Sequence, residues 1–123
     1  MGGSDQVEVL VVDDSHDLAE LLTYVLEEKG YTVRMALNGA QALEMVAERV
    51  PHCVILDVHM PAMNGREFAQ ALRARYHDDI VLIAVSGHAQ TDGEVAFTYG
   101  IVDHYFQKPF DFAELDKILP VLR

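Results

Sequence analysis

The stretch Val9-Leu10-Val11-Val12-Asp13-Asp14 decides the fold of this chain, because an unbroken apolar run ends in two carboxylates. A second run, Cys53-Val54-Ile55-Leu56, ends in Asp57 in the same way. Short runs rich in Val, Ile and Leu are typical of strands that are buried on both faces of a parallel sheet. We therefore expect two such strands, each with acidic residues at its carboxyl end.

Two later runs repeat this arrangement with other polar residues. The run Ile80-Val81-Leu82-Ile83-Ala84-Val85 leads into Ser86, and the shorter His104-Tyr105-Phe106 leads toward Lys108. The carboxyl ends of parallel strands meet at one edge of the sheet, which is where α/β folds place their functional sites. The sequence thus predicts three carboxylates, a hydroxyl and an ammonium group in one cleft, a cluster that no hydrophobic core requires.

The segment after the first strand has a helical pattern. Ser15 is a good N-cap, and Gly30 is a natural stop. Five apolar residues at helical spacing are predicted to share one face: Leu18, Leu21, Leu22, Val25 and Leu26. A strand is predicted over residues 31–36, followed by a turn at Asn38-Gly39. A second helix then has one face marked by Ala40, Leu43 and Ala47.

Three more helices complete the pattern. One is predicted over residues 66–75 with Phe68 inward, a weaker one over 90–99, and a last one carries Leu115 and Leu119 on one face. Five strands that alternate with five helices predict an α/β fold, a doubly wound parallel sheet with helices on both faces.

Composition limits the classes of function. The 123 residues suffice for one domain, which we expect over residues 7–123 after a flexible leader or cloning remnant at 1–6. A net charge of -11 argues against binding nucleic acid or an anionic membrane. No apolar run approaches the roughly 20 residues that span a bilayer. The single cysteine, Cys53, excludes a disulfide framework, fits a small core residue and suits a reducing cytoplasm.

The chemistry of the cluster points to phosphoryl transfer. Crowded carboxylates repel one another unless a proton or a cation lies among them, and Mg²⁺ prefers such hard oxygen ligands. A carboxylate can also attack phosphorus, and Asp57 is the best candidate because it stands alone at its strand end. Asp13 and Asp14 are better placed to hold the metal. Ser86 and Lys108 can each neutralise a phosphoryl oxygen.

Four segments, in this order and spacing, resemble the receiver domain of two-component response regulators, the CheY-like superfamily. The matching segments are Val11-Val12-Asp13-Asp14-Ser15, residues 55–65 (ILDVHMPAMNG), Val85-Ser86-Gly87-His88-Ala89, and residues 103–110 (DHYFQKPF). The resemblance covers about residues 7 to 123. It implies a flavodoxin-like fold with strand order 2-1-3-4-5.

The resemblance also implies a signalling role without enzymatic turnover of an external substrate. Asp57 would accept a phosphoryl group from a phosphohistidine on a sensor histidine kinase or a histidine phosphotransfer protein, and would later lose it by autodephosphorylation. Asp14 and Asp57 would ligate Mg²⁺ directly, Asp13 mostly through water, and the backbone carbonyl of His59 would complete the protein ligands. Mn²⁺ would substitute for Mg²⁺.

A conformational switch is implied by the same resemblance. Ser86 would swing toward the phosphoryl group, and Tyr105 would move into the space that is vacated. This would couple the site to the face formed by residues 90–99, the strand at 104–106 and the last helix, a face suited to phosphorylation-dependent dimerisation. Lys108-Pro109 would carry a cis peptide.

Three rival functions are weaker on the residues themselves. A phosphatase of the haloacid dehalogenase type wants a second acid two residues after its nucleophile, where this chain has His59. A flavin-binding module needs a phosphate-cradling loop after the first strand, where Asp13-Asp14 would repel a phosphate in the absence of a metal. An inactive pseudo-receiver that only docks would not need the intact acid, hydroxyl and lysine set.

His59 and His88 stand two residues beyond Asp57 and Ser86, where family members vary. They are either solvent-exposed loop residues or groups that tune the lifetime of the acyl phosphate, in a pH-dependent way because histidine titrates near neutrality. The sequence also leaves open whether this domain stands alone, relays phosphate, or belongs to a hybrid kinase or a longer regulator.

Overall fold

The computed structural model describes residues 7–58, 65–77, 79–86, 101–107 and 112–119. Its elements, in chain order, are β1 (Glu8–Val12), α1 (His16–Glu28), β2 (Thr32–Ala36), α2 (Gly39–Glu48), β3 (Cys53–Asp57), α3 (Gly65–Tyr76), β4 (Val81–Ser86), β5 (His104–Gln107) and α5 (Phe112–Ile118). The helix predicted over residues 90–99 lies outside the described residues.

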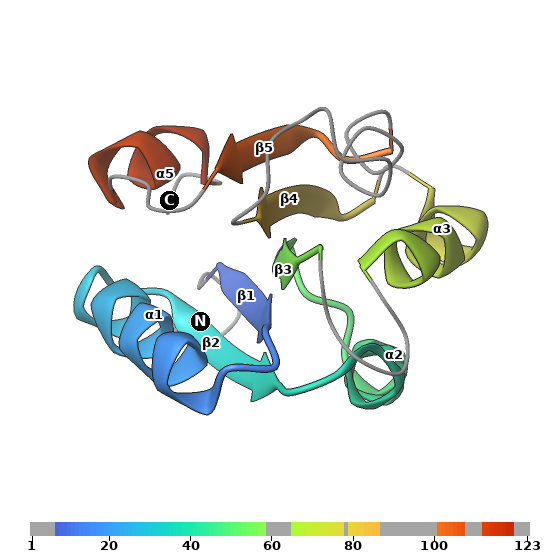
Figure 1. The fold of residues 1–123 in the computed structure, drawn as a ribbon, viewed down its shortest axis with the longest axis horizontal. Coiled ribbons are helices and arrows are strands. Elements are labelled where there is room, and N and C mark those ends of the chain that lie inside the picture. Colours follow the sequence, from blue (N-terminus) through green and yellow to red (C-terminus); the bar gives the residue numbers. More distant parts are fainter. Residues whose placement is uncertain (1–6, 59–64, 78, 87–100, 108–111, 120–123) are drawn as a thin grey trace.

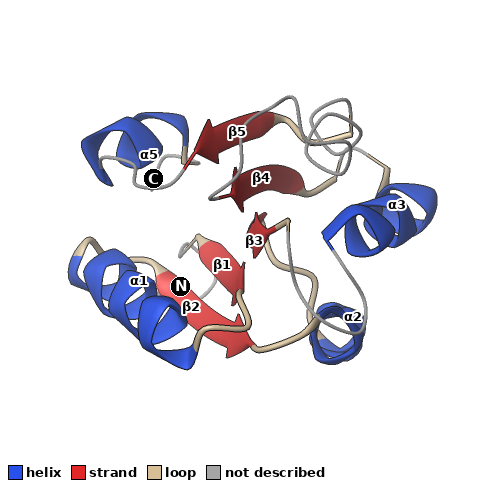
Figure 2. Ribbon diagram, in the orientation of Figure 1, coloured by secondary structure: helices blue, strands red, loops and turns tan. Residues whose placement is uncertain are grey.

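The five strands form one parallel sheet in the order β2-β1-β3-β4-β5. Helices α1 and α5 cover one face, and α2 and α3 cover the other (Figure 1 and Figure 2). This arrangement confirms the predicted doubly wound, flavodoxin-like fold. The order brings β1, β3 and β4 to the middle of the sheet, so their carboxyl ends are adjacent.

Alternating side chains on each strand serve two separate cores. On β1, Val9 and Val11 pack with the α1 and α5 side, whereas Leu10 and Val12 pack with the α2 and α3 side. Cys53 belongs to the first core and is completely buried, as expected. Burial of strand side chains on both faces explains why the central strands read as unbroken apolar runs.

Helix α1 begins where predicted but faces the sheet with different residues. The Ser15 hydroxyl accepts a hydrogen bond from the Leu18 N–H at 3.4 Å, and Gly30 follows the helix with φ of 100°. The side chains buried against the sheet are Ala19, Leu22 and Leu26. The prediction that Leu18 and Leu21 share one face with the buried leucines was wrong: both side chains are exposed, and Ala19 lies on the buried side instead.

Helix α2 also differs from the prediction at its start. Asn38 is the N-cap, since its side chain accepts a hydrogen bond from the Gln41 N–H at 2.7 Å, so Asn38-Gly39 opens the helix and is not an isolated turn. Its buried residues are Gly39, Ala42 and Val46. The predicted face was wrong for Ala40 and Ala47, which are exposed.

The other end of α2 is held by a residue of β2. The Arg34 guanidinium donates to the Met45 carbonyl at 3.0 Å and to the Arg49 carbonyl at 2.6 Å. The last turn of α2 has no basic residue of its own, so Arg34 supplies both the donors and the positive charge that a helix C-terminus favours.

The remaining expectations on the core are confirmed. Phe68 of α3 and Leu115 of α5 are buried, and Leu119 just beyond α5 is buried as well. Among the residues that the structure describes, no helix is both long and apolar enough to cross a bilayer.

Candidate functional site

The strand register brings the predicted site residues to one edge of the sheet. Val12, at the end of β1, lies beside Leu56 of β3, and Asp57 lies beside Val85 of β4. Asp57 and Ser86 are the last residues of their strands. Beyond these ends, the Val58 N–H donates to the Val85 carbonyl at 3.0 Å, which keeps β3 and β4 together at the site.

Three carboxylates meet at this edge, as predicted. Asp13, Asp14 and Asp57 each have an oxygen in a group whose members all lie within 4.8 Å of one another. Asp13 and Asp57 are buried, with 7% and 8% of their surface exposed, whereas Asp14 is open to solvent. Two buried acids beside a third are costly without a positive charge among them.

The backbone at the start of α1 aims the Asp13 carboxylate. The Asp13 N–H donates to the Ala36 carbonyl at 3.1 Å, which fixes this residue against the end of β2. Its Oδ1 accepts a hydrogen bond from the Ser15 N–H at 2.9 Å. One oxygen of Asp13 is therefore used for local structure, and the turn into α1 fixes the direction of the carboxylate.

The donor set at this edge fits a hard divalent cation. The three residues offer only carboxylate oxygens, which is the ligand type that Mg²⁺ binds, and neither thiolate nor imidazole belongs to this described group. Asp14, which is open to solvent beside the two buried acids, leaves a solvent-facing side on which waters or other oxygen ligands could complete the coordination of such a cation.

A second set of residues connects this edge with β5. Ser86 is completely buried at the end of β4. Tyr105 is half-buried and packs against Val58, which follows Asp57, and against Ala84, two residues before Ser86. Tyr105 therefore contacts residues directly beside the site, from the strand at the edge of the sheet.

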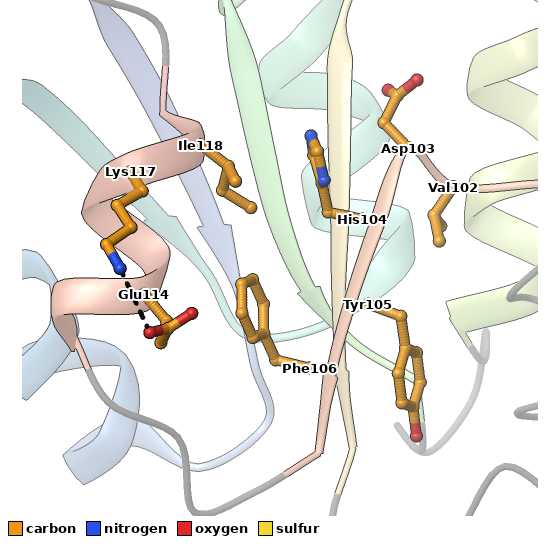
Figure 3. Close-up of a pocket in the computed structure, with 8 residues that line it drawn as sticks. All are labelled: Val102, Asp103, His104, Tyr105, Phe106, Glu114, Lys117 and Ile118. Atoms are coloured by element: carbon orange, nitrogen blue, oxygen red, sulfur yellow. Dashed lines mark hydrogen bonds and ion pairs between the residues drawn. The ribbon is translucent and has the colours of Figure 1, made fainter.

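The side chains of β5 point in opposite directions. Figure 3 shows Tyr105 on one side of the strand and Phe106 on the other. Phe106 packs against the core on the α1 and α5 side. A cavity of about 420 Å³ lies between β5 and α5, with Glu114 and Lys117 among its lining residues. A movement of β5 would therefore alter side-chain packing on both faces of the sheet.

Several predicted site residues fall outside the described part of the chain. Lys108, His59 and His88 are among them, as is the Lys108-Pro109 peptide bond. Their roles stay predictions. The structure brings together Asp13, Asp14 and Asp57, and it puts Ser86 on the strand next to that of Asp57.

Sequence reasoning missed a charged clamp at the opposite edge of the sheet. The Arg73 guanidinium donates to Asp103 Oδ2 at 2.7 Å and to three backbone carbonyls, those of His77, Ile80 and Ile101. Asp103 Oδ2 also accepts the Leu82 N–H at 2.8 Å. The clamp ties α3 to the starts of β4 and β5. No spacing rule signals it, because Arg73 does not stand out in the sequence from the two other arginines of α3.

This clamp favours the ionised form of the Asp103 carboxyl. Partial burial opposes ionisation, but the Leu82 N–H and the Arg73 guanidinium outweigh it, with a smaller contribution from His104. Together they hold the pKa of the Asp103 carboxyl below its usual range. This edge lies at the amino end of the strands, away from the three acids, so we interpret the clamp as structural.

Comparison with known proteins identifies one family to which this chain is similar. A model described as the response regulator receiver domain matches residues 9–120. The response regulator MprA of Mycobacterium ulcerans is 38% identical over 109 residues, which are 89% of this chain and 47% of that protein. The transcriptional regulatory protein PrrA of Mycobacterium tuberculosis is 36% identical over 113 residues, 92% of this chain and 48% of that protein.

A solved structure agrees with these relatives. The response regulator TrrA of Thermotoga maritima, crystallised in complex with Mg²⁺ and BeF, is similar with a TM-score of 0.80 and 32% identity, over 91% of this chain and 95% of that one. The chain spans about half the length of the curated relatives it matches.

Proposed function

This chain belongs to the response regulator receiver domain family, the signalling modules of two-component systems, and we propose that it acts by taking a phosphoryl group from a phosphohistidine onto Asp57. The observation that carries this proposal is the meeting of Asp13, Asp14 and Asp57 within 4.8 Å at the carboxyl edge of the sheet. The donor would be a sensor histidine kinase or a histidine phosphotransfer protein.

The transfer itself needs only one nucleophile from this chain. An oxygen of the Asp57 carboxylate attacks the phosphorus, the P–N bond of the phosphohistidine breaks, and the imidazole nitrogen keeps the electron pair. The product is an acyl phosphate on Asp57, and attack by water on its phosphorus restores the carboxylate and releases inorganic phosphate. The chain is thus both substrate and catalyst of one transfer, without turnover of an external substrate.

The acids around Asp57 would hold the metal. Asp14 and Asp57 would ligate Mg²⁺ directly, Asp13 mostly through water, and the His59 carbonyl would complete the set, with Mn²⁺ as a substitute. Mg²⁺ bound there would neutralise charge on the phosphoryl oxygens. Support comes from the all-oxygen donor set and from the relative crystallised with Mg²⁺ and BeF.

Ser86 and Lys108 would stabilise the phosphorylated state. The Ser86 hydroxyl would donate to one phosphoryl oxygen and the Lys108 ammonium would neutralise another. Movement of Ser86 would draw Tyr105 inward, since Tyr105 packs against Ala84 and Val58. We propose that this carries the signal to the face formed by residues 90–99, β5 and α5, through which phosphorylated copies would dimerise.

His59 and His88 would tune the lifetime of the acyl phosphate by controlling how water reaches it. Replacing both with Ala and timing hydrolysis between pH 6 and 8 is the measurement. We expect a changed rate and a flatter pH profile, because histidine titrates in this range. An unchanged rate and profile would show that both are ordinary loop residues.

The proposed location and partners concern the receiver domain itself. We propose that residues 7–123 act in the cytoplasm as one domain that binds neither nucleic acid nor membranes. The proposal on nucleic acid is restricted to these residues, since a relative of which the chain covers 48% is named a transcriptional regulatory protein. The rival phosphatase and flavin readings gain no support, since the matching proteins are response regulators.

The decisive experiment is intact mass after incubation with Mg²⁺ and a small acyl phosphate. Wild type is expected to gain one phosphoryl group in a Mg²⁺-dependent way. Asp57→Asn is expected to gain none, and Asp14→Asn to need much more Mg²⁺. Glu44→Gln, an exposed acid on α2, is the control that should behave as wild type. Wild type without an adduct would refute the proposal.

A further inference from the structure

β5 is the strand whose alignment in the sheet its own sequence specifies least. It has four residues, it lies at the edge of the sheet, and none of its residues is fully buried. Its two aromatic residues are adjacent, and Figure 3 shows Tyr105 and Phe106 on opposite sides of the strand. A slip of one residue would exchange their faces, but each face would still receive one aromatic ring. The apolar pattern of β5 therefore favours the observed register only weakly.

β4, the neighbour of β5, is aligned by the core. Five of its six residues are buried, and it pairs with β3 from Cys53↔Val81 to Asp57↔Val85. Residues 87–103 separate β4 from β5 in the sequence, so the two strands are not joined by a short turn that would fix their register. The alignment of β5 on β4 therefore depends on contacts outside the strand.

The Arg73 clamp provides such contacts directly before β5. The Asp103 N–H donates to the Leu82 carbonyl at 2.8 Å, and the Leu82 N–H donates to Asp103 Oδ2 at 2.8 Å. These two hydrogen bonds join the strands one step ahead of their first pair, Ile83↔His104. A slip of one residue would move Asp103 by about 3.3 Å and break both bonds, since hydrogen bonds span roughly 2.7–3.2 Å.

Arg73 holds Asp103 in this position and connects both strands to α3. Its guanidinium donates to Asp103 Oδ2 at 2.7 Å and to the Ile101 carbonyl at 3.1 Å, which precede β5. It also donates to the Ile80 carbonyl at 2.9 Å, which precedes β4. The guanidinium is a planar fork with fixed donor directions, and α3 is packed into the core. The fork therefore fits one alignment of the two strand starts.

The alignment matters because β5 ends at the site. Gln107, its last residue, pairs with Ser86, and Lys108 follows in the sequence. We propose that Arg73 is a positioning residue: through Asp103 it sets the register of β5 on β4. The register in turn fixes where Lys108 lies relative to Ser86. This inference rests on the proposed function for the role of Lys108, whereas the register follows from the clamp alone.

A slipped β5 would change the reaction without changing the metal site. Asp13, Asp14 and Asp57 belong to the ends of β1 and β3, which the clamp does not contact. A misplacement of about 1 Å can slow a reaction roughly 100-fold, and a slip of one residue is about 3.3 Å. Loss of the clamp should therefore slow phosphorylation of Asp57 and leave the affinity for Mg²⁺ unchanged. A residue needed only for stability would not separate these two quantities.

The register is tested by NMR on the labelled chain, through the cross-strand NOEs that report the β4–β5 pairs. Arg73→Met keeps the aliphatic part of the side chain, and Asp103→Leu keeps a similar size without an acceptor. In both variants these NOEs are expected to weaken or to be replaced by those of a shifted pairing. Arg75→Met removes the same charge from an exposed position on α3 and should keep the wild-type NOEs.

The kinetic test times phosphorylation by a small acyl phosphate at saturating Mg²⁺, followed by intact mass. The affinity for Mg²⁺ is measured separately, from the amide shift of Val58. We expect Arg73→Met and Asp103→Leu to react about 3- to 30-fold more slowly, with an affinity within about twofold of wild type. Asp103→Asn keeps an oxygen that can accept from Leu82 and Arg73, so it should recover most of the rate although the charge is lost.

The two proposals can fail separately. If wild type gains no phosphoryl group, the proposed function fails, and the NOEs still show whether the clamp sets the register. If wild type is phosphorylated but both clamp variants keep the wild-type NOEs or the wild-type rate, the inference fails alone. Rates and Mg²⁺ affinities that fall together would also overturn it, because general unfolding gives that result. Arg73→Lys, which keeps the charge, replaces Arg73→Met if circular dichroism shows that Arg73→Met is unfolded.

Discussion

At the scale of single residues, neighbouring carboxylates in this molecule have different surroundings. One oxygen of Asp13 is held by the Ser15 N–H, whereas Asp14, the next residue, is open to solvent. Asp57 is buried at the end of a strand and not at the start of a helix. These differences support a division of roles in which Asp13 and Asp14 hold a cation and Asp57 reacts.

The Asp103 carboxylate allows a prediction of how the free energy of unfolding depends on pH. Its pKa is lowered in the folded state, so its stabilising contribution is complete above the ordinary value of 3.8 and is lost as pH falls through the folded pKa. We expect Asp103→Asn to lower the free energy of unfolding by about 1 kcal/mol at pH 7, a small figure because the side chain is 44% exposed. Urea unfolding between pH 7 and 3 measures it.

The pH dependence distinguishes the clamp from simple packing. The difference between wild type and Asp103→Asn should begin to shrink below pH 3.8, where the carboxyl of the unfolded wild type takes up a proton, and should be lost once the pH falls below the folded pKa. Asp79→Asn, an exposed acid that precedes β4, is a suitable control with no expected change. A difference that stays constant down to pH 3 would mean that the charge of Asp103 contributes nothing.

At the scale of elements, the positions of helices were easier to predict than their faces. Ser15 and Gly30 marked both ends of α1, because capping depends on one or two residues that can be read directly. The face of α1 was misjudged, since a helix with apolar residues at 18, 21, 22, 25 and 26 has more than one apolar side. Which side packs depends on the sheet, and the buried side of α1 includes Ala19, which the pattern of large apolar residues does not mark.

Arg34 gives a prediction for the stability of α2. Arg34→Met keeps the aliphatic part of the side chain but leaves the carbonyls of Met45 and Arg49 without these donors. We expect a loss of about 1–2 kcal/mol in the free energy of unfolding, measured by thermal or urea denaturation. Arg34→Lys should recover only part of it, because an ammonium group cannot reproduce the guanidinium fork.

The control for this prediction is Arg75→Met, which removes the same charge from an exposed position on α3. It should change stability by less than about 0.5 kcal/mol. Equal losses of unfolding free energy in the two variants would indicate a general effect of net charge. The hydrogen bonds from Arg34 to the two carbonyls would then not stabilise the fold.

At the scale of the whole molecule, the sheet was the most predictable part. β1, β3 and β4 are central and buried on both faces, so their sequences are apolar without interruption and their acidic or hydroxyl ends stand out. The meeting of Asp13, Asp14 and Asp57 follows from parallel strands alone. The Arg73 clamp could not be predicted, because it joins residues 30 apart in sequence through the fold.

The link from the site to β5 leads to a prediction about the molecule as a switch. Tyr105 packs against Val58 and Ala84 on one side of β5, while Phe106 contacts the core shared with α5. If Tyr105 carries the change, Tyr105→Ala should still bind Mg²⁺ and beryllofluoride at Asp57 but should transmit less to α5. NMR amide shifts over residues 57–58 and 112–118, with and without the phosphoryl mimic, measure both ends.

In wild type we expect the mimic to shift amides at both ends of this path. In Tyr105→Ala the shifts near Asp57 should persist, and those in α5 should fall by more than half, since the ring that packs beside the site is gone. Tyr105→Phe keeps the ring and should resemble wild type in packing, so it separates the effect of the ring on these shifts from that of the hydroxyl. Undiminished α5 shifts in Tyr105→Ala would mean that the signal reaches this face through the backbone of β4 and β5, whose paired residues Ser86 and Gln107 lie directly beside the site.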